Sequence, residues 1–339
     1  MDRMKCVAIT GENSATIVEQ PIPKALDEFA VVKISVAPIC TEAKQYTTGT
    51  MHHPLGHEAA GEVAEIAQKG NVAPGDRVVV MPQYPCGRCQ LCLSGDYIHC
   101  LNIRNTEKMF GTEWGIDTYA QYVVKQDWLL IPIPDDISTE HASMACCGIG
   151  PSFGGMELAR VDSFDTVLIT GLGPVGLGGV INAVSRGARV IGVESNKYRS
   201  ELAKTLGAEI VVNPMDPDAL DQIKSYTAGL GVDKAIECSG VGAAALICIQ
   251  GSRRKGEVAL VGGSGDFTVN GWQDIVSMGL TIHGAWHWNY GAIDRIFRVI
   301  REHGDLIDLQ ITHTFPLDEF EDAWKLQLTG DCGKVLLYP

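Results

Sequence analysis

The chain has 339 residues, a length typical of two domains, and 45% of them are apolar, which is enough for a sizeable core. Its net charge of −14, without a basic cluster, argues against a nucleic-acid partner, because a phosphate backbone needs a positive surface. The opening "MDRMKCVAIT" lacks the apolar core of a signal peptide, and no apolar run reaches membrane-spanning length. We therefore expect a cytoplasmic protein with no membrane partner.

The first 150 residues predict an irregular, mostly β domain. Short apolar runs, bounded by Gly, Pro and Asp, predict strands at 30–39 ("AVVKISVAPI"), 75–82 ("GDRVVVMP") and 119–134 ("YAQYVVKQDWLLIPIP"). The eleven cysteines of the chain indicate metal binding or catalysis rather than disulfides, because cytoplasmic thiols stay reduced.

From about residue 165 the pattern changes to alternating strands and helices. Such alternation predicts a parallel sheet covered by helices on both faces. The expected strands lie at 165–171, 188–194, 209–214, 234–240, 257–263 and 280–286. The tail predicts a helix at 290–304 and ends in "GKVLLYP", which resembles strands of the first domain and indicates a return of the chain to it.

Four cysteines in "CGRCQLCLSGDYIHC" follow the pattern C-x2-C-x2-C-x7-C. Two-residue gaps let successive thiolates reach one ion, and the longer loop returns the fourth. Four thiolates form a closed tetrahedral zinc site, which is structural because no ligand position stays open. The alternative is an iron–sulfur cluster, which uses the same C-x2-C-x2-C run. The expected ligands are Cys86, Cys89, Cys92 and Cys100.

The segment "TVLITGLGPVGLGG" places G-x-G-x-x-G between an expected strand and an expected helix. Gly171 makes the tight turn, Gly173 lets the backbone approach a pyrophosphate, and Gly176 allows close packing of helix on strand. Glu194 ends the next expected strand, where a carboxylate binds a ribose 2′-hydroxyl and repels a 2′-phosphate. The pattern predicts a dinucleotide site and favours NAD over NADP, although a cation such as Arg199 can accommodate a 2′-phosphate.

Two further segments carry candidate ligands. Cys40 ends the apolar run "VAPIC", and His57 and Glu58 lie in "PLGHEAAGEV". Taken alone, a free cysteine is most often a buried apolar residue, and a His-Glu pair is most often an ordinary surface or core feature. Beside the other two motifs, all three become candidates for a metal site.

Together these motifs resemble the zinc-dependent medium-chain alcohol and polyol dehydrogenases, of the sorbitol and threonine dehydrogenase type. The resemblance rests on "PIC", "GHEAAGEV", the four cysteines, "GLGPVG" and "GKVLLYP", in the same order along essentially the whole chain. It implies an α/β protein with a GroES-like, mostly β catalytic domain and an inserted Rossmann domain, a doubly wound parallel sheet that binds NAD. The catalytic domain would comprise 1–150 and 288–339, with a structural zinc lobe at about 85–101, and the Rossmann domain 151–287.

The resemblance also implies a catalytic zinc held by Cys40, His57 and a third ligand from "MACCGIGPSFGG". Cys147 matches the ligand position, and Cys146 is its neighbour and alternative. In polyol-dehydrogenase relatives the residue after the histidine can bind zinc, which makes Glu58 a further candidate. A catalytic zinc needs three protein ligands and one open position, and this set supplies three or four. The cofactor-binding residues implied by the resemblance are Gly171, Gly173, Pro174, Val175, Gly176, Glu194, Arg199, Cys238 and Val261.

The chain departs from these relatives where their proton relay begins. They carry Ser or Thr two residues after the cysteine, and three residues after it an Asp that supports the zinc-bound histidine. Here those positions hold Glu42 and Ala43, and Gln45 replaces a relay histidine. Glu42 could accept the substrate proton, bind a polar substrate group, or point into solvent, and Thr41 could take the hydroxyl role.

We therefore predict a zinc enzyme with two Zn²⁺ per chain that reversibly oxidises a secondary alcohol to a ketone, with hydride passing to NAD. A polar polyol, sugar, cyclitol or amino alcohol is favoured as substrate because of Glu42 and the polar and aromatic pocket candidates. The alternatives are a dehydrogenase of simple alcohols, a zinc-free alkene reductase and a non-catalytic nucleotide-binding relative.

The resemblance implies a homodimer or homotetramer. The pocket candidates are His52, His53, Trp114, Trp286 and His287.

Overall fold

The computed structural model describes residues 2–50, 55–263 and 265–339. They form two compact units. The first comprises Met1–Cys146, Ile311–Thr329 and Lys334–Pro339, and the second comprises Cys147–Gln310 and Gly330–Gly333. His52 and His53 lie outside the described residues. No helix of the described residues is long and apolar enough to cross a membrane.

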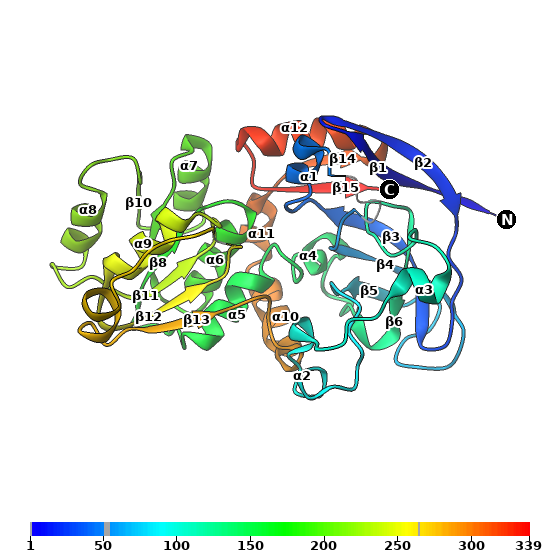
Figure 1. Cartoon of the computed structure of the whole chain (residues 1–339), viewed down its shortest axis with the longest axis horizontal. Coiled ribbons are helices and arrows are strands. Elements are labelled where there is room, and N and C mark those ends of the chain that lie inside the picture. The colour runs from blue at the N-terminus through cyan, green and yellow to red at the C-terminus, as the bar shows by residue number, and fades with distance from the viewer. Residues whose placement is uncertain (1, 51–54, 264) are drawn as a thin grey trace. The chain divides into compact units, whose positions relative to one another are not determined.

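The first unit is mostly β. One sheet has the order β14-β15-β3-β4-β5-β7, with β6 paired to β3, and β1 and β2 pair separately. Figure 1 shows the C-terminal β15 beside β3 from the N-terminal part, and the two are antiparallel. The strands are β1 (Arg3–Gly11), β2 (Ser14–Pro21), β3 (Phe29–Pro38), β4 (Ala59–Ile66), β5 (Arg77–Val80), β6 (Tyr122–Gln126), β7 (Leu130–Pro132), β14 (Ile311–Pro316) and β15 (Lys334–Tyr338).

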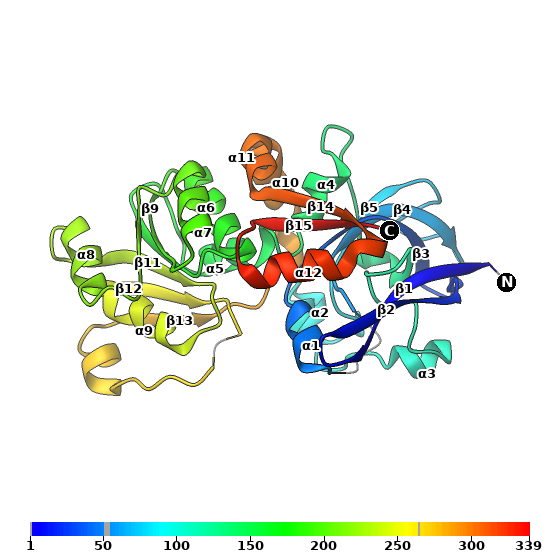
Figure 2. The same ribbon diagram turned by 90° about the horizontal axis from the view of Figure 1, so that it is seen from above.

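The helices of the first unit are short, apart from the last. Figure 2 shows that last helix, α12, running alongside β14 and β15, against which it packs. Its Trp324 is fully buried, and the indole ring packs at a tilt against Tyr46 and edge-to-face against Phe320. The helices are α1 (Ala43–Thr48), α2 (Gln90–Leu93), α3 (Thr106–Phe110), α4 (Thr139–Ser143) and α12 (Phe320–Thr329).

The second unit is a six-stranded parallel sheet with the order β10-β9-β8-β11-β12-β13. Counted from β8, this is the 3-2-1-4-5-6 order of a doubly wound dinucleotide-binding sheet, as the sequence predicts. The fully buried run "TVLIT" forms the central β8 because helices cover both its faces. The strands are β8 (Thr166–Thr170), β9 (Arg189–Val193), β10 (Ile210–Val212), β11 (Val232–Glu237), β12 (Ser252–Leu260) and β13 (Thr281–Gly284).

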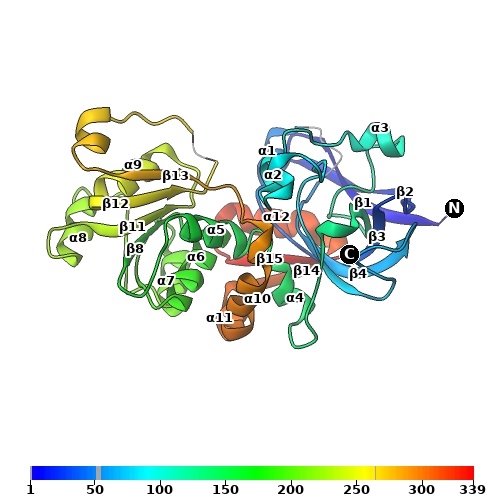
Figure 3. The same ribbon diagram turned by 90° about the horizontal axis from the view of Figure 1, so that it is seen from below.

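Helices pack on the two faces of this sheet. Figures 2 and 3, which view the molecule from opposite sides, show α9 on one face and α5 and α6 on the other. The core on the α9 side includes Leu168, Ile223 and Ile249, all buried. The helices are α5 (Gly150–Leu158), α6 (Pro174–Ser185), α7 (Lys197–Thr205), α8 (Ala219–Tyr226), α9 (Gly242–Gly251), α10 (Ile293–Glu302) and α11 (Gly304–Gln310).

The second unit extends further along the chain than the sequence predicts. Its main segment ends at Gln310, whereas we expected the return to the first domain at residue 288. The physical reason is that α10 and α11 pack on α6. The buried Gln310 side chain also donates hydrogen bonds to the carbonyl oxygens of Gly148 and Pro174, at 3.0 and 2.8 Å.

Candidate metal and cofactor sites

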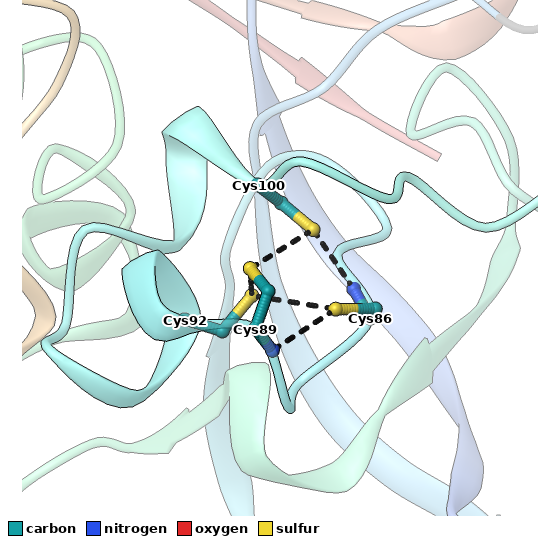
Figure 4. A group of neighbouring side chains, drawn as sticks. All are labelled: Cys86, Cys89, Cys92 and Cys100. Carbon is teal, nitrogen blue, oxygen red and sulfur yellow. Dashed lines mark hydrogen bonds between the residues drawn. The ribbon is translucent and has the colours of Figure 1, made fainter.

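The four cysteines predicted to bind zinc converge in the loop that carries α2 (Figure 4). Their Sγ atoms lie 3.5 Å apart for Cys89 and Cys92, 3.9 Å for Cys89 and Cys100, and 4.0 Å for Cys86 and Cys92. Four sulfurs placed tetrahedrally at about 2.3 Å from one ion would be about 3.8 Å apart. The donor set therefore fits a tetrathiolate zinc site.

Backbone N–H groups of the lobe support the negative charge of these sulfurs. The N–H of Cys89 donates to Cys86 Sγ at 3.3 Å, and the N–H groups of Cys86 and Asn102 donate to Cys100 Sγ at 3.2 and 3.3 Å. Backbone hydrogen bonds, the largest from Leu101, lower the pKa of Cys89 to about 6. The pKa of Cys86 is lowered as well, mainly by a backbone hydrogen bond from Arg88, whereas burial raises the pKa of Cys92 to about 12. The backbone therefore favours the thiolate, the form that binds metal, at Cys86 and Cys89.

A second group of possible ligands comes from three separate segments. Cys40 follows β3, His57 and Glu58 directly precede β4, and Cys147 follows α4. One ligand atom from each of these four lies within 4.8 Å of all the others. Two thiols, an imidazole and a carboxylate are all ligands that zinc accepts, so the donor chemistry fits the metal that the sequence predicts. Cys146 is not in the group: its buried Sγ lies 3.4 Å from the carbonyl oxygen of Val80.

Glu58 makes a buried ion pair that the sequence did not indicate. The Nζ atom of Lys334, at the start of β15, lies 2.8 and 2.9 Å from the two carboxylate oxygens of Glu58. Both side chains are 0% exposed. Burial raises the pKa of Glu58 to about 7, and the Lys334 ammonium opposes this shift. The only sequence signal was a single lysine in the otherwise apolar run "KVLLY".

Glu42 turns into the protein rather than into solvent. Its Oε1 lies 2.6 Å from His57 Nδ1, and its Oε2 accepts hydrogen bonds from the Tyr119 hydroxyl at 2.7 Å and the Cys40 N–H at 3.2 Å. The residue is 5% exposed. Burial alone would raise the pKa of Glu42, but the contacts with His57 and Tyr119 outweigh it and lower the value to about 2. This placement contradicts the option that Glu42 points into solvent.

The neighbours of Cys40 in the chain and one residue of α12 complete its surroundings. Thr41 is exposed and Ala43 is buried in the first turn of α1. Gln327, on α12, donates a hydrogen bond from its side chain to the carbonyl oxygen of Cys40. Neither Gln327 nor Tyr119 was singled out from the sequence, because both lie far from Cys40 along the chain.

The glycine-rich turn of the second unit has the geometry that the motif predicts. Gly171 has φ +77°, and a Cβ there would come within 2.4 Å of Ser239 Cβ. A Cβ on Gly176 would come within 2.0 Å of the Gly171 carbonyl oxygen, so helix and turn could not pack as they do. At Gly173, by contrast, a Cβ would meet nothing nearer than an Arg199 nitrogen at 3.7 Å. The turn therefore leaves room beside Gly173 for a ligand to approach the backbone.

Glu194 and the remaining candidates sit at the carboxyl ends of the parallel strands. Glu194 Oε2 accepts a hydrogen bond from the Leu172 N–H of the turn, and Oε1 accepts from Ser195 and Asn196, each at 2.8 Å. This edge is where doubly wound sheets bind ligands. Pro174 and Val175 begin α6 after β8, Cys238 follows β11, and Val261 follows β12.

The aromatic pocket candidates have different environments. Trp114 packs against a cluster formed by Met4, Cys6 and Ala120 in the first unit. In the second unit Trp286 is 54% exposed, whereas His287 is buried with φ +68° and its ring stacks on Trp288. Their role in a substrate pocket stays a prediction.

Comparison with known families decides the assignment. The model of the alcohol dehydrogenase GroES-like domain matches residues 27–135, and the model of the zinc-binding dehydrogenases matches residues 174–302. Together they span more than half of the chain. The chain belongs to the zinc-dependent medium-chain alcohol and polyol dehydrogenase family.

Curated members of this family align along nearly the whole chain. Sorbitol dehydrogenase from Bacillus subtilis (strain 168) is 30% identical, over 99% of this chain and 97% of that protein. L-threonine 3-dehydrogenase from Pyrococcus horikoshii is 32% identical, over 95% and 94%. The family assignment therefore covers both units and both candidate metal groups.

Solved structures of the family share the fold. Alcohol dehydrogenase TADH from Thermus sp. ATN1 superposes with a TM-score of 0.88 over 98% of this chain and 99% of that one, at 24% identity. A putative zinc-binding dehydrogenase from Sinorhizobium meliloti 1021, bound to NADP, gives a TM-score of 0.84 at 25% identity, with both chains fully covered.

The two groups of metal ligands predict two zinc ions per chain. Elemental analysis of the purified protein should find both. Cys89→Ser should remove one zinc and Cys40→Ser the other, because each variant breaks a different ligand set. Cys238→Ser, which removes a thiol outside both groups, should keep both ions. Iron in the four-cysteine lobe, or a single zinc in the unaltered protein, would contradict the assignment.

Proposed function

We propose that this dehydrogenase oxidises a secondary alcohol reversibly to the ketone, with NAD as hydride acceptor and with a catalytic zinc held by three of Cys40, His57, Cys147 and Glu58, which leaves its fourth position open to the substrate. The observation that carries the proposal is the convergence of those four side chains within 4.8 Å. A zinc-free alkene reductase would not need such a donor set, and a purely nucleotide-sensing relative would need only the second unit's turn. Both alternatives are therefore disfavoured.

The residues of the two sites have distinct tasks under this proposal. Cys40 and Cys147 supply thiolates, and His57 supplies Nε2, because its Nδ1 faces Glu42. Glu58 is held by Lys334, with its Oε1 3.9 Å from His57 Nε2. Zinc held there would act as a Lewis acid that polarises the alcohol oxygen. The nicotinamide would take up hydride from the carbinol carbon, and the hydroxyl proton would pass to solvent. The backbone around Gly173 and the start of α6 would receive the pyrophosphate.

The substrate class is proposed to be polar: a polyol, sugar, cyclitol or amino alcohol rather than a simple alkanol. Support comes from the relatives at about 30% identity, which include sorbitol and threonine dehydrogenases. The sequence suggested Glu42 as a contact for a polar substrate, but the structure does not support that role. Both of its carboxylate oxygens face partners inside the first unit.

A panel of alcohols tests the reaction and the substrate class together. With NAD, D-sorbitol or L-threonine should exceed 2-propanol in kcat/KM by about tenfold or more, the value of one hydrogen bond to a charged group. The chelator 1,10-phenanthroline should abolish this activity and added Zn²⁺ should restore it. Preference for simple alkanols would overturn the substrate class. Chelator-resistant reduction of enones would indicate the zinc-free reductase, and nucleotide binding without turnover of any alcohol would indicate the non-catalytic relative.

Cofactor choice is proposed to favour NAD because of Glu194. The carboxylate stands at the end of β9 beside the glycine-rich turn, where it would repel a 2′-phosphate. Arg199 lies beside the same turn and its Nε donates to the carbonyl oxygen of Cys332 at 3.2 Å, so part of the guanidinium already has a partner. The opposing observation is the NADP bound to the Sinorhizobium meliloti relative.

Replacing Glu194 should shift this preference. Glu194→Ser should lower kcat/KM for NAD by about tenfold and raise the relative use of NADP, because a charged acceptor is lost and a repulsive charge is removed. Glu194→Gln keeps an acceptor for the Leu172 N–H and should show the charge effect with less disturbance of the turn. Steady-state kinetics with both cofactors measures the ratio. An unchanged ratio in both variants would show that Glu194 does not select the cofactor.

We further propose that copies of this chain associate through β13, as a dimer or tetramer. β13 is one of the two edge strands of the parallel sheet, and its Ile282 is 38% exposed. Trp272, Val276 and Trp286, in the segments flanking β13, are also exposed. An exposed apolar edge strand is stable in a native protein when something covers it, and a second copy is the partner that the family resemblance suggests.

Light scattering after size-exclusion chromatography tests this association. The unaltered protein should elute at a multiple of the 36.5 kDa chain mass, and Ile282→Lys should shift it toward the monomer. Lys204→Glu, an exposed change on α7, is a control that should keep the assembled mass. A monomeric unaltered protein would contradict the proposal.

A cytoplasmic location also remains a proposal. Its support is that none of the eleven cysteines, all within the described residues, forms a disulfide, which is typical of a reducing compartment.

A further inference from the structure

Glu42 lies where the chain departs from its relatives, and its side chain is fixed on three sides. Its backbone begins α1, and its carbonyl oxygen accepts hydrogen bonds from the Gln45 and Tyr46 N–H groups at 2.9 and 3.2 Å. The carboxylate does not cap its own helix. It turns back to the Cys40 N–H, the Tyr119 hydroxyl and the His57 ring.

The contact with His57 determines which ring nitrogen can bind metal. Nδ1 lies 2.6 Å from Glu42 Oε1, a distance at which an N–H donates to a carboxylate. In the neutral ring, a proton on Nδ1 means that Nε2 is unprotonated and is the nitrogen that can donate its lone pair to a metal. Nε2 lies 3.9 Å from Oε1 of Glu58, another member of the candidate ligand group. The ring therefore presents its unprotonated nitrogen to the metal group.

We propose that Glu42 is the positioning residue of the catalytic zinc site: it fixes the tautomer and orientation of His57, and Tyr119 in turn orients Glu42. The inference rests on the proposed function. In the relatives that the chain resembles, an Asp one residue further along supports the histidine, and that position here is Ala43. Glu42 begins one residue earlier and reaches further by one methylene, so the carboxylate arrives at the histidine by a different route.

The burial of Glu42 argues against the roles first considered for it. A proton acceptor or substrate contact needs an oxygen that faces the substrate. Glu42 is 5% exposed, and its oxygens contact His57, Tyr119 and Cys40. A carboxylate that supports a ligating histidine raises the basicity of the ring and holds its direction, and loss of such a partner weakens metal affinity by about 10–100-fold.

The test measures zinc affinity rather than turnover alone. The purified protein with both zinc ions is titrated with a chromophoric chelator, and the zinc of the four-cysteine lobe serves as an internal reference. Glu42→Gln should weaken the other zinc by about 10–100-fold and leave the lobe zinc unchanged. Glu42→Thr, which cannot reach His57, should lose at least as much. Tyr119→Phe should fall between Glu42→Gln and the unaltered protein, because the Glu42 carboxylate remains but is held less firmly.

A matched control and kinetics complete the design. Glu62→Gln changes an exposed carboxylate on β4 and should keep both affinities. If Glu42→Gln keeps the zinc affinity but lowers kcat, Glu42 is a proton acceptor, and if it keeps the affinity but raises KM, Glu42 contacts substrate. Either result overturns the inference about Glu42 but leaves the proposed function unaffected. A protein from which Cys40→Ser removes no zinc has no catalytic zinc, which overturns the proposed function and this inference with it.

Discussion

Glu58 and Lys334 lie 276 residues apart in the sequence, yet their charged groups meet at 2.8 and 2.9 Å with no exposure to solvent. Removing one partner of such a buried pair costs about 3–5 kcal/mol, because the other charge is left without compensation. The pair therefore holds β15 beside the segment that carries His57. β15 also pairs with the end of β3, and the N–H of Ile39 donates to the Val335 carbonyl oxygen at 2.9 Å. One strand from the end of the chain thus fixes the segments of Cys40 and Glu58 together.

The charges gathered around that strand explain why a divalent cation suits the site. As thiolates and carboxylates, Cys40, Cys147, Glu42 and Glu58 would bring four negative charges together, and Lys334 supplies one fixed positive charge. Desolvated like charges disfavour one another strongly unless a cation compensates them. A divalent ion among these donors would offset much of that repulsion, so metal binding and the fold around the donors support each other.

The sequence predicts those features whose residues are close together along the chain. The glycine-rich turn and the four-cysteine lobe each repeat one residue type at a fixed spacing, so the spacing alone indicates which groups meet. The partner of Glu42 depends on the direction of a side chain at the start of α1 and on a ring fifteen positions later, which no local pattern contains. Lys334 lies even further along the chain from its own partner, Glu58. The place of α10 and α11 was missed for the same reason, since it follows from packing on α6.

The same local arrangement, a carboxylate that accepts hydrogen bonds from nearby backbone N–H groups, recurs at the ends of strands in both units. Glu42, Glu194 and Glu237 each follow or end a strand, and each carboxylate accepts hydrogen bonds from backbone N–H groups within three residues. Glu194 and Glu42 also reach a more distant segment, the glycine-rich turn in one case and the His57 ring in the other. Loops at strand ends otherwise carry unsatisfied donors and many conformations. By binding these donors, the carboxylates fix the loops before a ligand arrives, so less ordering is left for the ligand to drive.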